Sequence, residues 1–310
     1  MRADIIRVRS INYGRIPAMG KRFLLSTVLM VFLLPIPRAA SAQDEVQVRL
    51  LGGAIANASL DGYEGGYSFT RAGAALSWRW LTLSYTASRF SWDNAEALPF
   101  GNQRDVPWEY LHTLDLNAAF SGQTGVAGLN WFAGGNVYSS WEKEMSNSFG
   151  FGGRAGIVWD VAKNWRLRLG AFLMYHPTGL DGFPVMGLSW QEDGAEEKGW
   201  SFSLGAPSTN LQYRFSPLLA VSLGAGYHYG IHRLADDSPV VSAGYIRHRN
   251  IVGGIYSHLS PEFLPGLKIT LGLEGNFWRE LELYDDDGDK FASYDVGNGL
   301  GFILSAAYGF

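Results

Sequence analysis

The histidines, hydroxyls and carboxylates are the groups of this chain that could carry out chemistry, since its 310 residues include six His and no Cys. The absence of Cys excludes thiol catalysis and cysteine-based zinc sites. A Ser–His pair supported by Asn, Asp or Glu would be the arrangement of a lipid hydrolase or acyltransferase. His112 lies on the apolar face of a predicted strand, but no serine-containing motif accompanies it. The simpler interpretation is that His112, with Tyr110 and Trp108, places its polar tip among lipid headgroups. We therefore predict no catalytic residue.

Metal binding has similarly weak support in the sequence. His228 and His232 lie four residues apart on one face of a predicted strand, but two ligands are too few for a zinc site. The segment Asp285–Asp289 contains a glycine, as calcium loops do, but it lacks their full spacing and the terminal bidentate Glu. We predict no metal and no cofactor, and we interpret this segment as part of a solvated acidic loop at residues 282–292. Bridging to lipopolysaccharide phosphates through divalent cations is a weaker alternative.

Basic and polar residues form a more informative set, because many share the predicted inward faces of strands. Six basic residues lie near short turns: Arg49, Arg79, Arg166, Arg168, Arg214 and Lys268. Seven further polar residues lie on faces of the same kind: Asp115, Asn117, Asn130, Arg154, His228, His232 and Glu274. If the interior is open, the basic residues form a ring at its inner mouth and tune ion selectivity. If it is closed, the arginines pair with acids such as Asp115 and Glu274 and fill it.

Alternation of side-chain character predicts the strands that position these residues. In residues 81–88 apolar side chains alternate with hydroxyls, and in residues 219–232 they alternate with small or polar side chains. A period of two residues is that of a β-strand. We count fourteen such stretches in residues 43–310, and tight turns alternate with longer loops between them. Twelve is the alternative, if the short runs 200–204 and 211–215 form one kinked strand and a neighbouring strand is lost.

The outward faces of these strands are apolar and bracketed by aromatic residues. The belt residues are Trp78, Trp165, Tyr175, Tyr308 and Phe310. Only 17% of all residues are charged, below the roughly 25% of a soluble domain, while a mean hydropathy of −0.03 argues against a helical membrane protein. We predict an all-β fold, a transmembrane antiparallel β-barrel with aromatic belts at the membrane–water boundaries. A soluble β-sandwich would also alternate, but it would not need outward faces with so little charge.

The last twelve residues, 299–310, form the clearest predicted strand. Every second side chain back from Phe310 is apolar, and the other face is mostly small. This pattern resembles the C-terminal signature of Gram-negative outer-membrane proteins, which the barrel-assembly machinery reads. The resemblance implies insertion into the bacterial outer membrane, with its lipids and lipopolysaccharide as surroundings.

Residues 1–42 have the order of a secretory signal peptide. Basic residues precede the uncharged run 23–34, and small residues lead up to Ala42. We predict translation from Met19, cleavage after Ala42 and a mature barrel of residues 43–310. The leader holds seven of the 25 basic residues and one of the 29 acidic residues, which leaves the mature part with a net charge of −10. This balance does not indicate nucleic-acid binding.

A stretch in the middle of the chain resembles a known family. Its pattern is Pro184-Val185-Met186-Gly187-Leu188 with Trp190, then Gly199-Trp200-Ser201-Phe202-Ser203-Leu204-Gly205 with Pro207, Asn210-Leu211 and Tyr213-Arg214. About 30 residues are similar to a widespread, uncharacterised family of bacterial outer-membrane barrel proteins. The resemblance implies a fold and a location, and no activity.

Three hypotheses for function follow from these patterns. The first is a channel or passive transporter for small polar or anionic solutes, with a porin-like barrel and no enzymatic activity. The second is a lumen-packed structural or surface barrel that does not conduct. The third is an envelope-lipid hydrolase or acyltransferase. The sequence leaves the solute, the oligomeric state and the openness of the lumen undecided.

Overall fold

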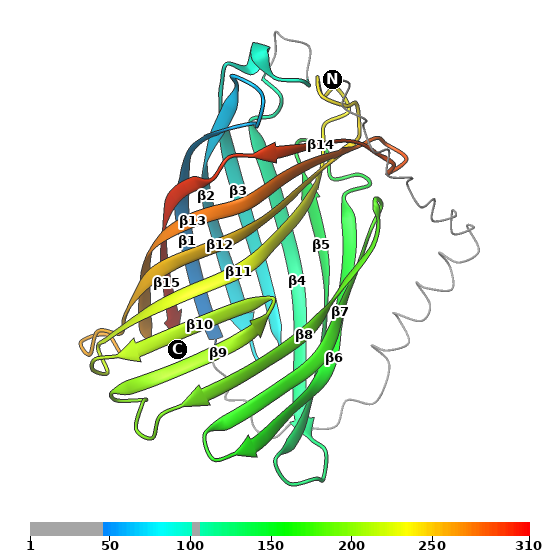
Figure 1. Cartoon of the computed structure of the whole chain (residues 1–310). Helices are drawn as coiled ribbons and strands as arrows, with labels where there is room; N and C mark the ends of the chain where they lie inside the picture. The colour runs from blue at the N-terminus through cyan, green and yellow to red at the C-terminus, as the bar shows by residue number, and fades with distance from the viewer. Residues whose placement is uncertain (1–45, 101–105) are drawn as a thin grey trace, which may run out of the picture. The chain divides into compact units, whose positions relative to one another are not determined.

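The computed structural model describes residues 46–100 and 106–310 (Figure 1). The predicted signal peptide, its start at Met19 and its cleavage after Ala42 lie outside the described residues. No helix in the described part has the length and apolar character needed to cross a membrane.

The described residues fold into strands joined by turns and loops, with one short 3₁₀ helix among them, η1 (Ala95–Ala97). The strands are β1 (Val46–Ser59), β2 (Gly66–Trp78), β3 (Leu81–Asp93), β4 (Tyr110–Gln123), β5 (Leu129–Trp141), β6 (Phe149–Ala162), β7 (Trp165–His176), β8 (Gly179–Gln191), β9 (Gly199–Ala206), β10 (Ser208–Arg214), β11 (Leu219–Arg233), β12 (Tyr245–Leu259), β13 (Leu267–Tyr284), β14 (Lys290–Val296) and β15 (Gly299–Gly309).

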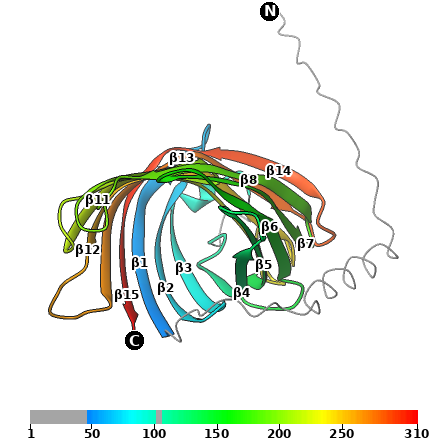
Figure 2. The same ribbon diagram turned by 90° about the horizontal axis from the view of Figure 1, so that it is seen from below.

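Fourteen strands close into a ring, as predicted. Each strand from β1 to β13 pairs antiparallel with the next, and β15 pairs with both β1 and β13. Seen from below, the strands form a closed loop (Figure 2). The short runs at 199–206 and 208–214 are two separate strands, so the count is fourteen rather than twelve.

β14 is not a fifteenth strand of the ring, because it continues the register of β15 along β13. Asn276 lies opposite Gly299 in β15, and Arg279 lies opposite Val296 in β14. The acidic loop predicted at 282–292 is therefore shorter than expected. β13 extends to Tyr284 and β14 begins at Lys290, so only residues 285–289 connect them.

Two ends of the barrel can be distinguished by their connections. Val46 and Phe310 pair at one end, where the backbone N–H of Val46 donates to the Phe310 carbonyl at 3.1 Å. We call this the turn end. The opposite end, which we call the loop end, carries the long connections 94–109 and 234–244.

The strand alternation divides apolar from polar side chains as predicted. Outward-facing leucines are widely exposed, for example Leu273 and Leu300 at 72% and 73%. The opposite faces carry residues such as Ser84, Asp115 and Asn136. An exposed apolar band around a closed sheet matches the hydrocarbon layer of a membrane and leaves no unpaired strand edge inside it.

The wall of the barrel is uneven in height, because β9 and β10 have only eight and seven residues. The pairing of β8 with β9 begins at Met186, and that of β11 with β10 ends at Gly226. The last part of β11 therefore has no β10 partner. It leans across to β5 instead, where Arg233 and Trp141 form a parallel bridge and Glu142 N–H donates to the Arg233 carbonyl at 2.9 Å (Figure 1). At the loop end, β11–β13 thus lie across the opening bounded by β1–β5.

Candidate functional site

A buried apolar cluster fills the barrel at the loop end, and we call it the outer plug. Its members come from β1–β4 and β12–β14, from the loop before β4 and from the first residues after β1 and β11: Ala58, Leu60, Tyr67, Phe90, Leu98, Phe100, Trp108, Leu111, Leu234, Ile246, Leu281, Leu283 and Val296. All are at most 7% exposed. Because strands that are far apart in the ring contribute to one cluster, the lumen is closed at this level.

Trp108 lies at the centre of the outer plug. Its ring makes an edge contact with Trp92 at 4.6 Å between centroids and stacks on Phe100 at 6.0 Å. The Trp92 indole N–H donates to the Trp108 carbonyl at 2.7 Å. Trp108 is only 1% exposed, so its predicted place in the lipid headgroups was wrong. The loop that precedes β4 folds into the barrel mouth, because Phe100 and Trp108 bury more apolar surface there than on the rim.

The other face of the leaning strands carries a buried ionic network centred on Arg247. Its guanidinium lies 3.1 Å from Asp181 Oδ2 and 3.4 Å from Glu282 Oε2. It also lies over the ring of Tyr284 at 4.7 Å. Tyr229 OH donates to the same Asp181 oxygen at 2.6 Å. We call these residues the Arg247 network, and they hold β11–β13 against β8 because a buried charge is costly without its partners.

The loops above these strands are held together by further charges. Lys143 Nζ lies 2.7 Å from Asp237 Oδ1, and Glu142 Oε2 accepts from the backbone N–H of Ala235 at 2.8 Å. The hydrogen bond with Lys143 lowers the pKa of Asp237. Burial raises the pKa of Glu142, against the opposing effect of its bond to Ala235. These contacts join the loops after β5 and β11 above the plug.

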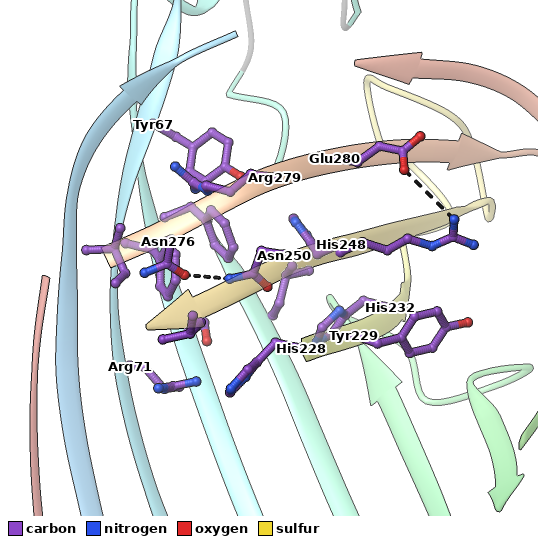
Figure 3. Close-up of a pocket in the computed structure, with 18 of the residues that line it drawn as sticks. Tyr67, Arg71, His228, Tyr229, His232, His248, Asn250, Asn276, Arg279 and Glu280 are labelled. Carbon is purple, nitrogen blue, oxygen red and sulfur yellow. Dashed lines mark hydrogen bonds and ion pairs between the residues drawn. The ribbon is translucent and has the colours of Figure 1, made fainter. Parts of the chain in front are cut away.

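Beneath the outer plug lies a cavity of about 180 Å³, which we call the lumen pocket (Figure 3). Polar residues from β2 and β11–β13 line it: Arg71, His228, His248, Asn250, Glu274 and Asn276. The rings of Tyr67, Phe69 and Phe90 form its apolar wall. The pocket therefore combines charge, hydrogen-bond donors and aromatic surface at one level of the barrel.

Several polar groups of the lumen pocket have partners, whereas five lining residues each have a buried nitrogen without one in the described chain: Arg71, His232, His248, Arg249 and Asn276. Asn250 Nδ2 donates to Asn276 Oδ1 at 2.5 Å, and Tyr256 OH donates to Glu274 at 3.1 Å. In contrast, Asn276 Nδ2 and Arg71 Nε are buried and have no hydrogen-bond partner within the described residues. Asn276 is only 4% exposed. A buried donor without an acceptor costs about 1–3 kcal/mol, so these two groups indicate a site for an acceptor.

Most predicted basic residues lie at the turn end on lumen-side strand faces. Arg49, Arg214 and Lys268 stand at the ends of β1, β10 and β13. Arg166 pairs with Asp160 at 2.9 Å, and Arg168 lies over the Phe132 ring at 5.5 Å. Arg79 differs, because it lies in the β2–β3 turn with its guanidinium 5.2 Å from the Trp78 ring. It therefore stands beside an outward-facing residue rather than within the ring.

The predicted polar residues lie on the lumen side but are not gathered at one place. Asp115 accepts from Asn136 Nδ2 at 2.5 Å, and Asn117 lies opposite Asn136. His232 lies 3.2 Å from the Thr113 hydroxyl. Two others stand elsewhere on the wall: Asn130 pairs with Gln123, and Arg154 with Phe172. The hydrogen bonds of Asp115 and Glu274 go to Asn136 and Tyr256, whereas Arg166 pairs with Asp160 and Arg247 with Asp181 and Glu282.

The aromatic belt residues lie at both ends of the wall. Trp78, Trp165, Tyr308 and Phe310 stand at the turn end, and Tyr175 lies near the loop end. Trp165 contacts Phe202 at 5.6 Å, and the rings of Tyr308 and Phe310 are 5.7 Å apart.

Several histidines lie within hydrogen-bond distance of hydroxyl groups. His112 lies on the outward face, where its Nδ1 is 2.8 Å from Tyr85 OH and its ring stacks on Trp141. Sequence reasoning missed a second arrangement, in which Ser222 Oγ lies 2.9 Å from His258 Nε2. The other ring nitrogen faces the Thr270 hydroxyl at 3.1 Å instead of a carboxylate, and Ser222 is only 3% exposed. This buried serine belongs to a hydrogen-bonded chain of Ser222, His258 and Thr270 across β11–β13.

Within the described residues, no group of three or more His, Asp or Glu side chains could hold a metal ion. The acidic loop closes on itself, since the backbone N–H of Asp289 donates to the Asp285 carboxylate at 2.8 Å.

Comparisons with known proteins gave matches to solved structures only, since no family model and no curated protein matches the chain. An outer membrane channel of the COG4313 group from Pseudomonas putida F1 is 10% identical, with a TM-score of 0.44, over 89% of this chain and 100% of that one. The toluene transporter TodX of P. putida is 9% identical, with a TM-score of 0.34, over 87% and 91%. The KdgM porin is 9% identical, with a TM-score of 0.30, over 86% and 99%. The fold assigned above rests on the strand pairing of this chain itself.

Proposed function

We propose that this chain is a channel of the bacterial outer membrane for small polar or anionic solutes, closed at its loop end in the conformation described above. The lumen pocket carries the proposal. A barrel with a purely structural role has no need of a cavity with buried, unpartnered donors such as Asn276 Nδ2, because filling it with apolar side chains would be more stable.

The distribution of charge supports an orientation. The turn end, with the basic residues Arg49, Arg166 and Arg168, would face the periplasm. The loop end, with Glu144, Asp237 and its other acids, would face outward. Charged rings at a pore mouth select ions by sign, so anions that pass the loop end would be drawn towards the turn end.

The manner of closure supports an opening movement of β11–β13. Near the loop end, these strands reach β5 through one bridge, at Arg233 and Trp141. The other contacts described across the mouth are the outer plug, the Arg247 network and the loop contacts of Glu142 and Lys143, and each of them depends on side chains. Side-chain contacts can part without unpairing the wall lower down, where β11, β12 and β13 stay in continuous ladders.

Recording of ionic current across planar bilayers that contain the purified, folded chain would test this proposal. We expect brief, infrequent current steps that carry more anions than cations. Changing Arg49, Arg166 and Arg168 together to Gln should shift the reversal potential towards cation selectivity. The double change Trp78→Phe and Trp165→Phe is the matched control, because these side chains face lipid at the same end.

The outer plug favours a second candidate, a structural or surface barrel without conduction. In that case, no current would flow even after the plug is weakened by substitution. Absence of current steps from the wild type and from every plug variant would remove the channel and leave this candidate.

We further propose that β15 is the segment that the barrel-assembly machinery binds. The strand has a continuous apolar outward face, and Phe310 at its end is 65% exposed. Deletion of Phe310 should lower the amount of folded protein in the outer membrane, measured against total protein in the cell envelope. Equal amounts of folded protein with and without Phe310 would contradict this assignment.

A further inference from the structure

We propose that the lumen pocket binds a small monocarboxylate with a planar, ring-sized apolar body. This inference rests on the proposed channel and names the class of solute that it would take. It is argued from three features of the pocket: its charge, its apolar wall and its size.

Arg71 supplies the positive charge. Its side chain points into the pocket beside His228 (Figure 3), and its Nε is buried without a hydrogen-bond partner in the described chain. Arg249 Nε also lacks a partner there, but its terminal nitrogens pair with Glu280 and Glu282, and Arg279 donates to the Gly297 carbonyl at 3.0 Å. Arg71 is therefore the cation that is available to a bound anion, and a guanidinium matches a carboxylate in shape.

Asn276 supplies a second donor. Its Oδ1 accepts a hydrogen bond from Asn250, which orients the side chain and leaves Nδ2 without a partner in the described chain. The residue is only 4% exposed. A buried amide donor that is held in place and unpartnered favours a ligand oxygen. Arg71 and Asn276 both line the pocket, and both lack an acceptor.

Glu274 limits the ligand to one negative charge. Its carboxylate lines the same pocket and is held by Tyr256 OH at 3.1 Å. A second carboxylate on the ligand would lie in its field, and like charges in a partly buried site repel each other.

The apolar wall and the size of the pocket determine the body of the ligand. Phe69 and Phe90 stack at 5.4 Å between centroids, and Tyr67 lies 5.5 Å from Phe90. Such rings favour another planar ring by stacking or edge contact. A cavity of about 180 Å³ has room for one six-membered ring, since an engineered protein cavity of about 150 Å³ binds benzene.

Equilibrium binding of benzoate to the purified full chain in detergent, measured by calorimetry, tests the inference. We expect benzoate to bind at least about tenfold more tightly than benzyl alcohol, which lacks the charge, and than phthalate, which has two. Arg71→Gln should weaken benzoate binding by about tenfold or more, and Asn276→Ala by several-fold. Arg154→Gln, which changes a lumen arginine that does not line the pocket, should leave benzoate binding unchanged.

The inference is overturned if benzyl alcohol or phthalate binds as tightly as benzoate, or if Arg71→Gln and Asn276→Ala both bind benzoate as the wild type does. If Arg71→Gln does not fold, Arg71→Lys keeps the charge, and with Asn276→Ala it tests the same site. The measurement is independent of conduction. Current without benzoate binding would contradict this inference and keep the channel, whereas benzoate binding without current in any plug variant would keep the site and remove the channel.

Discussion

The turn half and the loop half of this barrel share their strands but differ in what faces the axis. Towards the turn end, β1, β7 and β13 present Arg49, Arg166, Arg168 and Lys268, and the fourteen strands surround the lumen as one ring. Towards the loop end, β11–β13 lie across the mouth, and side chains of β12–β14 meet those of β1–β4 in the outer plug. The closure of the loop end therefore depends on the length of the strands β9 and β10. Because β9 and β10 are short, β11 is free to lean.

Removal of the central ring of the outer plug should have the largest effect on stability. Trp108→Ala removes a side chain that is 1% exposed, and we expect it to lower the free energy of unfolding by about 3–5 kcal/mol. Urea unfolding in detergent micelles measures this change. Trp78→Ala is the control, because Trp78 is half exposed on the outward face and should cost much less. Equal losses from the two substitutions would contradict the assignment of the plug as a packed core.

Removal of the charge in the Arg247 network should have the next largest effect. Arg247→Met leaves Asp181 and Glu282 without their shared partner, and we expect a loss of about 2 kcal/mol in the free energy of unfolding. The full penalty for an unpaired buried charge is not reached, because Lys290 also pairs with Glu282. Combining Arg247→Met with Asp181→Asn should recover part of the loss, whereas additive losses would show that the two residues do not interact.

Thiol labelling can compare solvent access in the two halves of the barrel, because the chain has no Cys of its own that would react. Ser84→Cys places a thiol on the lumen face of β3, and Leu111→Cys places one in the outer plug, where Leu111 is 2% exposed. A charged, membrane-impermeant thiol reagent should react with Cys at position 84 much faster than at position 111. Addition of Trp108→Ala should speed the reaction at position 111 only. Similar rates at the two positions in the unsubstituted background would mean that the loop end is open.

The smallest effect is expected for the exposed ion pair above the plug. Lys143→Met removes the partner that lowers the pKa of Asp237. A lowered pKa contributes stability above the ordinary value of 3.8, and that contribution is lost as the pH falls through the value in the folded state. The small difference in urea midpoint between wild type and Lys143→Met at pH 7 should therefore disappear at a pH well below 3.8. A difference that grows on acidification would contradict this pairing.

Much of the wall was predictable from sequence, because each ring strand carries its own alternation. Residues 81–88 and 219–232 show it clearly, and tight turns such as Lys163–Asn164 led to a count of fourteen strands, with twelve as the alternative. The outward position of His112 followed from the same period.

The closed mouth was not predictable, because it depends on contacts between strands that are distant in the chain. Arg247 lies in β12 on the face opposite His248, and alternation alone cannot tell which of these faces is covered where the strand lies across the mouth. Trp108 was expected in the headgroups, because an aromatic residue beside a strand end has that place in a regular barrel. The unpartnered donors of Arg71 and Asn276 were missed for a similar reason, since lack of a partner is visible only in three dimensions.

The central claim is that a conducting barrel is closed by its outer plug, and bilayer recordings of the wild type and Trp108→Ala side by side test it most directly. The account predicts rare, brief, anion-selective openings for the wild type and frequent openings of the same selectivity for Trp108→Ala. A large, steady current from the wild type, or silence from both proteins, would contradict it.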